Sequence, residues 1–173
     1  AFFEVGDIYY NEKFEPVGVI YWVNNANIKE AMAISLKQAK LIIGKMPVDF
    51  DTPDMDNGYL NTQAVVAKNT SEGWGLTAAN SAIIWASQLD ASGEWYLPAI
   101  NEVIEIYKQK TDINQLLTAV GGIALPNSYL LSSTVMLKNG KKTYYELNAR
   151  GEIAYESNTY SDSSFAIKKV TKK

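Results

Sequence analysis

The stretch GEWYLPAINEVIEIYKQK, residues 93–110, predicts an extended segment that runs directly into a helix. Pro98 is expected in the first helical turn, where its missing N–H costs no hydrogen bond. Apolar side chains then recur at i, i+3, i+4 and i+7, which predicts one buried face. They are Ile100, Val103, Ile104 and Tyr107. We interpret Glu102 and Glu105 as solvated residues that the helix dipole favours near the N-terminus.

Strands are expected on both sides of this junction, from β-branched and aromatic residues between turn signals. They span residues 6–10, 16–23, 31–36, 129–134, 142–149, 152–157 and 164–170. The range 31–36 alternates like a strand, although its Lys and Gln flanks would also suit a helix. Asn139–Gly140 is a typical hairpin signal.

Two further helices are predicted after the irregular region 44–76, which itself holds at most a short helix from Asn61 or Thr62. The first begins at its N-cap, Thr77, and includes Trp85. The second is capped by Thr111 or Asp112 and ends at Gly121. The chain is thus expected to be one α+β domain, residues 1–173, with a mostly antiparallel sheet, two to three packed helices, and both terminal strands together.

The 173 residues contain neither Cys nor His. This excludes a disulfide framework, a thiolate zinc site and a Ser-His-Asp triad. A catalyst would have to use carboxylates, Lys or Tyr alone, so we expect no enzymatic activity. The longest apolar runs, such as residues 17–23, are too short to span a bilayer, and we expect no transmembrane segment.

Charge is distributed unevenly along the chain. Residues 1–128 hold 8 Lys and 15 acidic residues, whereas residues 129–173 hold 7 Lys and one Arg against 4 acidic residues. The basic end is suited to an anionic partner; alternatively, its lysines protect edge strands from aggregation. A single Arg argues against nucleic acid as the partner.

The segment DFDTPDMDNG, residues 49–58, offers oxygen ligands of the kind that Ca²⁺ prefers. Its spacing differs from the EF-hand pattern, and Pro53 interrupts it. We therefore expect a solvated, turn-rich loop and no metal, with Asp51, Asp54 and Asp56 as the candidate ligands if Ca²⁺ binds.

Tryptophan side chains are candidates for stacking on sugar rings. Trp85 and Trp95 fit core positions better, and Trp22 is a further candidate. Trp74, between two glycines, is the best exposed candidate. The complete set of candidate ligand-binding residues is Trp74, Asp54, Asp56, Asn57, Lys138, Lys141 and Lys142.

Two catalytic interpretations are weaker. Ser132, Ser133 and Thr134 have no base to activate them, so we expect them to satisfy backbone groups. Glu102 and Glu105 share one side of a helix, whereas a glycosidase needs two carboxyl groups facing each other across the substrate.

The motifs GYLNT (58–62), GEWYLPAINE (93–102), INQLL (113–117), YLLSST (129–134) and RGEI (150–153) follow in an order that resembles a bacterial surface-domain family. This family is named for the C-terminal domain of collagen-like adhesins, and it also occurs as a major paralogous domain of fibre-degrading bacteria. The resemblance covers roughly residues 58–170. It implies a C-type-lectin-like fold and a secreted or cell-surface module that recognises carbohydrate or other extracellular ligands. Collagen-like adhesin members are associated with sulfated glycosaminoglycans, for which the basic C-terminal region would be the matching feature.

The chain departs from the family pattern at three positions. The family prefers Ser or Thr in place of Ala99, Leu in place of Val103, and Trp in place of Leu131. The missing Trp removes an aromatic platform or repacks the core. The same junction also resembles the relatives of the formylglycine-generating enzyme, which share the lectin-like architecture but act through a cysteine pair that is absent here.

These observations together predict a non-enzymatic extracellular module of the bacterial cell surface that binds a glycan or a host matrix component. The alternative is a structural assembly module that contacts other subunits of a fimbria-like structure. A third, weaker alternative is a carboxylate-based hydrolase.

Overall fold

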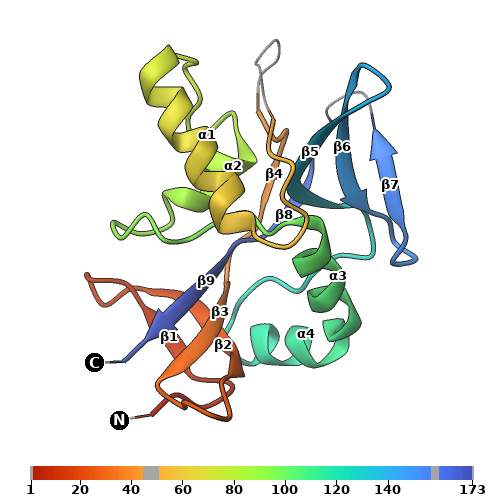
Figure 1. The fold of residues 1–173 in the computed structure, drawn as a ribbon. Coiled ribbons are helices and arrows are strands. Elements are labelled where there is room, and N and C mark those ends of the chain that lie inside the picture. The colour runs from red at the N-terminus through yellow and green to blue at the C-terminus, as the bar shows by residue number, and fades with distance from the viewer. Residues whose placement is uncertain (1, 45–50, 157–159, 173) are drawn as a thin grey trace.

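The computed structural model describes residues 2–44, 51–156 and 160–172, in which four helices and nine strands form one α+β arrangement (Figure 1). The first sheet has the order β1-β2-β3-β9 and the second the order β4-β8-β5-β6-β7. All strand pairs are antiparallel except β5 with β8. The expected α+β, mostly antiparallel class is therefore confirmed.

The first sheet unites the two ends of the chain, as predicted. Its strands are β1 (Ile8–Tyr10), β2 (Pro16–Val23), β3 (Glu30–Ser35) and β9 (Ile167–Thr171). The ambiguous range 31–36 is thus a strand, and it pairs with β9 from Ile34 opposite Ile167 to Glu30 opposite Thr171. Strand β9 is the last strand of this sheet.

The second sheet combines β4, which precedes the helices in the chain, with four strands that follow them. Its strands are β4 (Ala39–Leu41), β5 (Leu130–Lys138), β6 (Lys141–Leu147), β7 (Ile153–Glu156) and β8 (Asp162–Ser164). Asn139 and Gly140 have φ angles of 53° and 75°, which is the left-handed conformation that the predicted two-residue turn between β5 and β6 requires.

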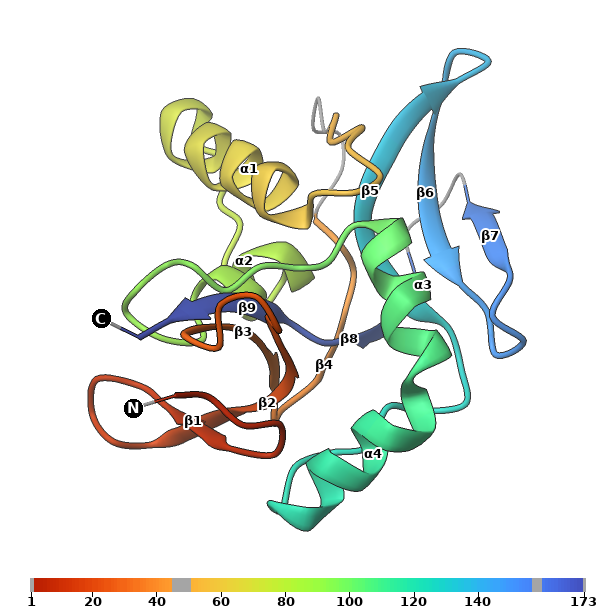
Figure 2. The ribbon, with the colours of Figure 1, turned by 60° about the horizontal axis from the view of Figure 1, so that its bottom comes forward.

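One ribbon connects the two sheets. Strands β3 and β4 follow each other along the chain, as do β8 and β9, and each pairs with the corresponding strand of the other segment. Where the ribbon passes between sheets, the Ser35 N–H donates to the Ala166 carbonyl at 2.9 Å, and the Ala166 N–H donates to the Ser35 hydroxyl at 3.0 Å. Figure 2 shows β8 and β9 nearly in line along this ribbon.

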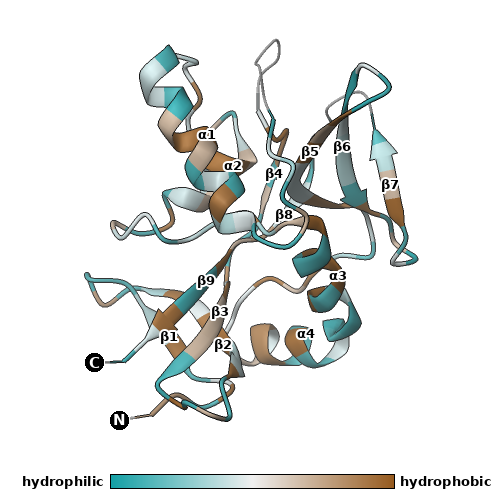
Figure 3. Cartoon of the chain, viewed as in Figure 1, coloured by the Kyte–Doolittle hydropathy of each residue, from teal (hydrophilic) through white to brown (hydrophobic). Residues whose placement is uncertain are grey.

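The helices are α1 (Gly58–Glu72), α2 (Ala82–Ser87), α3 (Ile100–Lys108) and α4 (Lys110–Ala119). The prediction that 44–76 is irregular is wrong for α1, which starts before Asn61; residues 45–50 lie outside the described residues. The side chain of Asn57 caps α1 by accepting the N–H of Leu60 at 3.1 Å. Only four α1 residues are buried, so its apolar stripe is weak, as the mixed colours along it in Figure 3 show.

Three helix boundaries also differ from the predictions. Helix α2 starts after Ser81, whose hydroxyl accepts the Ile84 N–H at 3.3 Å, while Thr77 belongs to the preceding turn. Gln109 rather than Thr111 or Asp112 caps α4, because α3 runs almost directly into it. Pro98 precedes the N-cap of α3 instead of lying in its first turn. The described part of the chain thus holds four helices, where two to three are expected from the sequence.

The junction at residues 93–110 lies in the middle of the core, as its pattern predicts. Trp95 and Leu97 are fully buried in one apolar cluster, while Tyr96 and Val103 belong to a second cluster with Phe165. Gly18 of β2 lies so close to Trp95 that a Cβ there would come within 2.8 Å of the indole ring. The backbone of Tyr96 pairs with Ile167, so the junction is bonded to β9 at one point.

Candidate functional site

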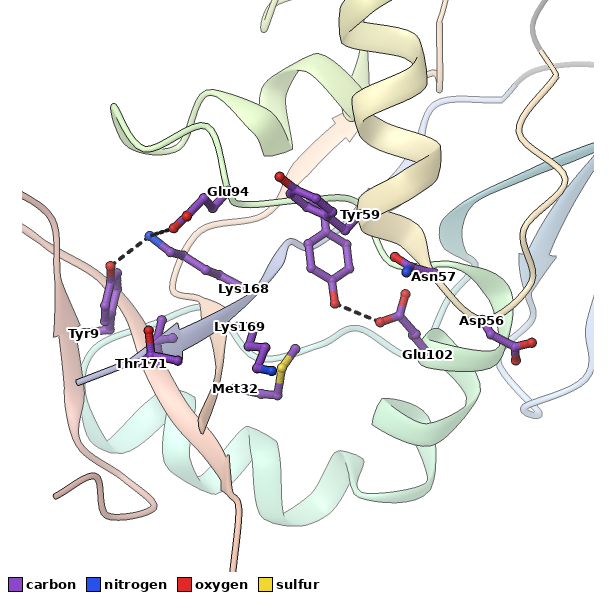
Figure 4. Close-up of a pocket in the computed structure, with 12 residues that line it drawn as sticks. Tyr9, Met32, Asp56, Asn57, Tyr59, Glu94, Glu102, Lys168, Lys169 and Thr171 are labelled. Atoms are coloured by element: carbon purple, nitrogen blue, oxygen red, sulfur yellow. Dashed lines mark hydrogen bonds and ion pairs between the residues drawn. The ribbon is translucent and has the colours of Figure 1, made fainter. Parts of the chain in front are cut away.

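A groove follows the outer edge of β9 and continues toward α3 (Figure 4). It consists of two adjoining hollows of about 660 and 670 Å³ that share Met32, Asp56, Glu102 and Lys169. The first is also lined by Tyr9, Tyr59, Glu94, Tyr96, Lys168, Val170 and Thr171, and the second by Tyr21, Trp22, Glu30 and Glu105. We call these two hollows the β9 groove.

The first hollow lies along the edge of the sheet rather than over one face. Its lining includes four consecutive residues of β9, Lys168 to Thr171. Successive side chains of a strand point to opposite faces. A hollow that touches all four therefore follows the strand edge, where α1 and the segment before Trp95 form the other wall.

Glu102 connects the starts of two helices at the floor of the groove. Its Oε1 accepts the N–H of Gly58 at 2.6 Å and the N–H of Ala99 at 3.1 Å. Its Oε2 accepts the hydroxyl of Tyr96 at 2.8 Å. Two helix N-termini thus direct their free N–H groups at one carboxyl group, an arrangement in which helix dipoles favour negative charge.

Burial raises the pKa of Glu102, although its hydrogen bonds from Gly58, Ala99 and Tyr96 oppose this effect. Burial, followed by the nearby Glu102, also raises the pKa of Tyr96 and of Tyr21. Both phenols therefore stay protonated at neutral pH, and the Tyr96 hydroxyl acts as a donor.

The prediction that Glu102 is solvated is wrong. The signal that identifies it is its position, three residues after the N-cap Ala99, where a Glu side chain can reach back to the N-cap N–H. Glu105 is exposed, as predicted, and pairs with Lys108 at 2.9 Å. The two carboxylates consequently have different environments.

A buried lysine, Lys168, lies at the end of the first hollow opposite Glu102 (Figure 4). The ammonium of Lys168, whose side chain is 4% exposed, donates to the Tyr9 hydroxyl at 2.9 Å and to Ser92 Oγ at 3.0 Å. It also lies 3.3 Å from a Glu94 oxygen and 3.6 Å from Asp90 Oδ2.

Asp90, the buried partner of this lysine, also accepts the indole N–H of Trp95 at 2.7 Å. Burial alone would raise its pKa, but hydrogen bonds from Ser92 and Trp95, together with Lys168, hold the pKa below its ordinary value. Burial would lower the pKa of Lys168, yet Tyr9 and Asp90 raise it. The pair is therefore charged at neutral pH.

Aromatic side chains form the walls of the groove. Tyr59 is 40% exposed and packs edge-on against Tyr96 at 5.9 Å. Trp22 is 45% exposed beside the second hollow. Tyr9 packs edge-on against the buried Trp95 at 6.0 Å. These contacts hold the rings in place while Tyr59 and Trp22 keep exposed surface toward solvent.

The groove carries more negative than positive charge. Its cations are Lys168 and Lys169, and its acidic residues are Glu30, Asp56, Glu94, Glu102 and Glu105. Each cation already has a carboxylate nearby: Glu94 for Lys168 at 3.3 Å and Glu30 for Lys169 at 3.7 Å. An anionic ligand would therefore meet unbalanced repulsion in the groove.

Of the residues predicted from the acidic loop, Asp56 and Asn57 line the groove. Asp54 instead builds the turn: its Oδ1 accepts the N–H groups of Asp56 at 2.9 Å and Asn57 at 2.8 Å. Asp56 Oδ1 accepts an amide N–H of Asn101 at 2.7 Å. These bonds order the loop in front of α1.

The candidate Ca²⁺ ligands do not converge in the described part of the chain, where no three acidic side chains gather in a way that could hold a metal ion. Asp51 is exposed, and Oδ1 of Asp54 is already bonded to two backbone N–H groups. Asp49, which belongs to the same acidic segment, lies outside the described residues.

Trp74 lies at the end of α1 that is remote from the groove. Its indole N–H donates to Glu72 at 3.0 Å, and its half-buried ring packs against the core. Gly73, with a φ of 63°, ends the helix just before it. The helix has 15 residues, which at 1.5 Å each separates its two ends by about 22 Å.

The three predicted lysines lie on the β5–β6 hairpin, away from both Trp74 and the groove (Figure 1). Lys138 lies 4.4 Å from the centre of the Tyr155 ring. Lys138 and Lys141 line a separate hollow of about 430 Å³ with Tyr155 and Glu156. The predicted ligand-binding residues are thus distributed over three regions of the molecule.

The segment Ser132–Thr134 is buried and serves backbone groups, as expected. The Ser132 hydroxyl donates to the Tyr145 carbonyl at 2.5 Å. The Thr134 hydroxyl donates to the Asp54 carbonyl at 2.9 Å and accepts the Ile100 N–H at 3.0 Å. The Ser132 bond joins β5 to β6, and the Thr134 bonds join β5 to the loop before α1 and to the start of α3.

Helices of the described residues are all too short or too polar to cross a bilayer. No family model, curated protein or solved structure matches this chain.

Proposed function

We propose that this chain is a non-enzymatic extracellular binding module of the bacterial cell surface, of C-type-lectin-like architecture, that holds a glycan in the β9 groove. The observation that carries the proposal is the combination of exposed aromatic surface and polar groups along one open groove. Pyranose rings present apolar C–H faces that stack on aromatic side chains, and their hydroxyls bond to carboxylates and amides. Tyr59 and Trp22 offer the first kind of contact, and Asp56 and Asn57 offer the second.

The sulfated glycosaminoglycan that the family resemblance implies is less suitable for this groove, because its lining is predominantly acidic. The lysines expected to bind such a ligand lie on the β5–β6 hairpin, where Glu156 accompanies Lys138 and Lys141. We therefore propose a glycan without sulfate or uronate groups as the ligand.

A hydrolase is less well supported by the same geometry. Glu102 already accepts three hydrogen bonds, two of them from backbone N–H groups of helix starts. A general acid needs a proton that it can transfer to the substrate, whereas this carboxyl group bonds as an acceptor to donors that belong to the fold.

Titration calorimetry with neutral and sulfated oligosaccharides tests the proposal. We expect a neutral oligosaccharide to bind, and Tyr59→Ala and Trp22→Ala each to weaken binding by about tenfold, equivalent to about 1.4 kcal/mol. Tyr155→Ala is the matched control, because Tyr155 is 52% exposed on β7 and outside the groove. Failure of all glycans to bind would contradict the proposal and support the assembly role.

A further inference from the structure

We infer that the ligand of the β9 groove is an uncharged saccharide that carries acetamido groups, and that these groups bond to the free edge of β9. This inference rests on the proposed function and names the class of sugar. Three features lead to it: unpaired backbone groups at the edge of β9, carboxylates on the opposite wall, and the acidic charge of the lining.

The direction of the backbone groups of β9 follows from hydrogen bonds at both of its ends. Ile167 exchanges N–H···O bonds with Tyr96, at 3.0 and 3.1 Å, on the side away from β3. Lys172 donates its N–H to the Lys29 carbonyl at 2.9 Å, on the β3 side. Because the direction alternates along an antiparallel strand, the N–H and C=O groups of Lys169 and Thr171 point away from β3.

No strand of the described residues lies beside these outward groups. Strand β9 ends the first sheet, and its bridge to Tyr96 involves Ile167 alone. Within the described ranges, the backbone groups of Lys169 and Thr171 form no hydrogen bond with protein. Both residues line the first hollow, so two donors and two acceptors border the groove, about 7 Å apart along the strand.

The opposite wall presents acceptors of a different kind. Glu94 lies two residues before Tyr96, in the segment that reaches β9 at Tyr96, and Asp56 and Asn57 lie directly before α1. Figure 4 shows Glu94 and Asn57 across the hollow from Thr171 and Lys169. A ligand group between the walls therefore meets backbone N–H donors on one side and carboxylate acceptors on the other.

A secondary amide has the donor and acceptor directions that this groove requires. In its trans form, the C=O and the N–H point to opposite sides of one planar unit. The C=O of an acetamido group can accept a β9 N–H while its N–H donates to Glu94, which lies across the hollow from Thr171 (Figure 4). Its methyl group adds apolar contact with Tyr59, which is 40% exposed. A hydroxyl in the same place lacks this fixed opposition of donor and acceptor.

The charge of the groove selects among acetamido sugars. Carboxylates outnumber the two lysines, and each lysine already lies within 4 Å of a carboxylate. Sulfate and uronate groups would be repelled at this short range. The inferred ligand is therefore a neutral N-acetylhexosamine oligomer.

The test compares three oligosaccharides of one length: β-1,4-linked N-acetylglucosamine, β-1,4-linked glucose and an alternating N-acetylglucosamine–glucuronate chain. The first two differ only in the acetamido group. We expect the N-acetylglucosamine oligomer to bind at least about tenfold more tightly than the glucose oligomer, and the uronate chain to bind more weakly than either. Equal affinity of the first two would overturn the inference while leaving the proposed function intact.

Variants of β9 separate backbone from side-chain contacts. Lys169→Pro and Thr171→Pro each remove an outward N–H without removing a bond to β3, whereas Lys169→Ala and Thr171→Ala keep it. We expect the proline variants to lose the preference for acetamido sugars and the alanine variants to retain it, with circular dichroism confirming the fold. Retained preference in both proline variants, or displacement of the sugar by an extended peptide that binds more tightly, would overturn the inference.

Discussion

The hydroxyl of Tyr96 donates a 2.8 Å hydrogen bond to the carboxyl group of Glu102, six residues further along the chain. The backbone of Tyr96 is at the same time bonded to Ile167 of β9, while Glu102 accepts the N–H of Gly58 at the start of α1. This pair therefore connects the strand edge, the helix that faces it and the junction between them. The shape of the β9 groove depends on these bonds.

Replacing Glu102 with Ala should destabilise the protein by about 1–3 kcal/mol, because the N–H groups of Gly58 and Ala99 lose their acceptor. Glu102→Gln should cost less, since its amide oxygen can still accept. Urea denaturation measures both. Glu105→Ala is the control, as an exposed residue whose loss should stay within about 0.5 kcal/mol. If Glu102→Ala and Glu105→Ala lowered the free energy of unfolding equally, Glu102 would not stabilise the contact between the starts of α1 and α3.

Gly58→Ala tests whether α1 is held against the junction. Helix propensity alone predicts stabilisation by about 0.5–1 kcal/mol. The structure predicts the opposite sign, because a Cβ would lie 2.3 Å from the Leu97 carbonyl and 2.5 Å from the Ala99 nitrogen. We expect a loss of about 1–3 kcal/mol, measured by thermal unfolding.

Ala67→Gly provides the comparison at an exposed position of the same helix, where propensity alone should cost about 1 kcal/mol. A Gly58→Ala protein that melts above the wild type would show that α1 does not pack as described.

Lys168→Met should lower stability by about 3–5 kcal/mol, because it leaves Asp90, 2% exposed, without its cation. Adding Asp90→Asn should recover much of this loss, since the amide oxygen can still accept the Trp95 N–H. A double-mutant cycle in urea measures the coupling. If the double variant were less stable than Lys168→Met by the full cost of Asp90→Asn alone, the two side chains would not act as a pair.

Stability should decrease as the pH rises from about 4.5 to about 9. Glu146, 1% exposed, has a pKa raised from 4.5 to about 9, chiefly by burial and then by Asp162 and Glu156. A carboxyl group with a raised pKa binds more protons in the folded than in the unfolded state over this range, so its contribution is complete below 4.5 and lost as pH rises through 9.

Glu146→Gln should flatten this dependence, because an amide does not titrate. Melting temperatures measured from pH 5 to pH 9 for both proteins provide the check. Parallel curves would mean that other groups cause the decrease.

Replacing Lys138, Lys141 and Lys142 together with Ala should leave the affinity for a neutral glycan unchanged, because these residues lie on the β5–β6 hairpin and outside the groove. Calorimetry at low and high salt provides the measurement. A large loss of affinity would move the ligand site to the hairpin.

Several features of the fold follow from local sequence patterns. Alternating β-branched and aromatic residues predict β2 and β3, and Asn139–Gly140 predicts the hairpin turn, because these conformations depend on neighbouring residues. The i, i+3, i+4 pattern after Pro98 predicts α3 for the same reason. The local pattern underestimates α1 because its apolar residues form no continuous buried stripe, and contacts with the junction and β5 stabilise it instead.

The site depends on contacts that no local pattern contains. The sequence by itself determined that the terminal strands share a sheet, that Trp95 is buried and that Cys and His chemistry is absent. Only the tertiary structure decided that Glu102 faces Gly58, 44 residues away, and that Lys168 meets Tyr9 across 159 residues. Secondary structure follows from periodicity within a few residues, whereas a groove forms where distant segments pack together, and their approach depends on how the whole core is filled.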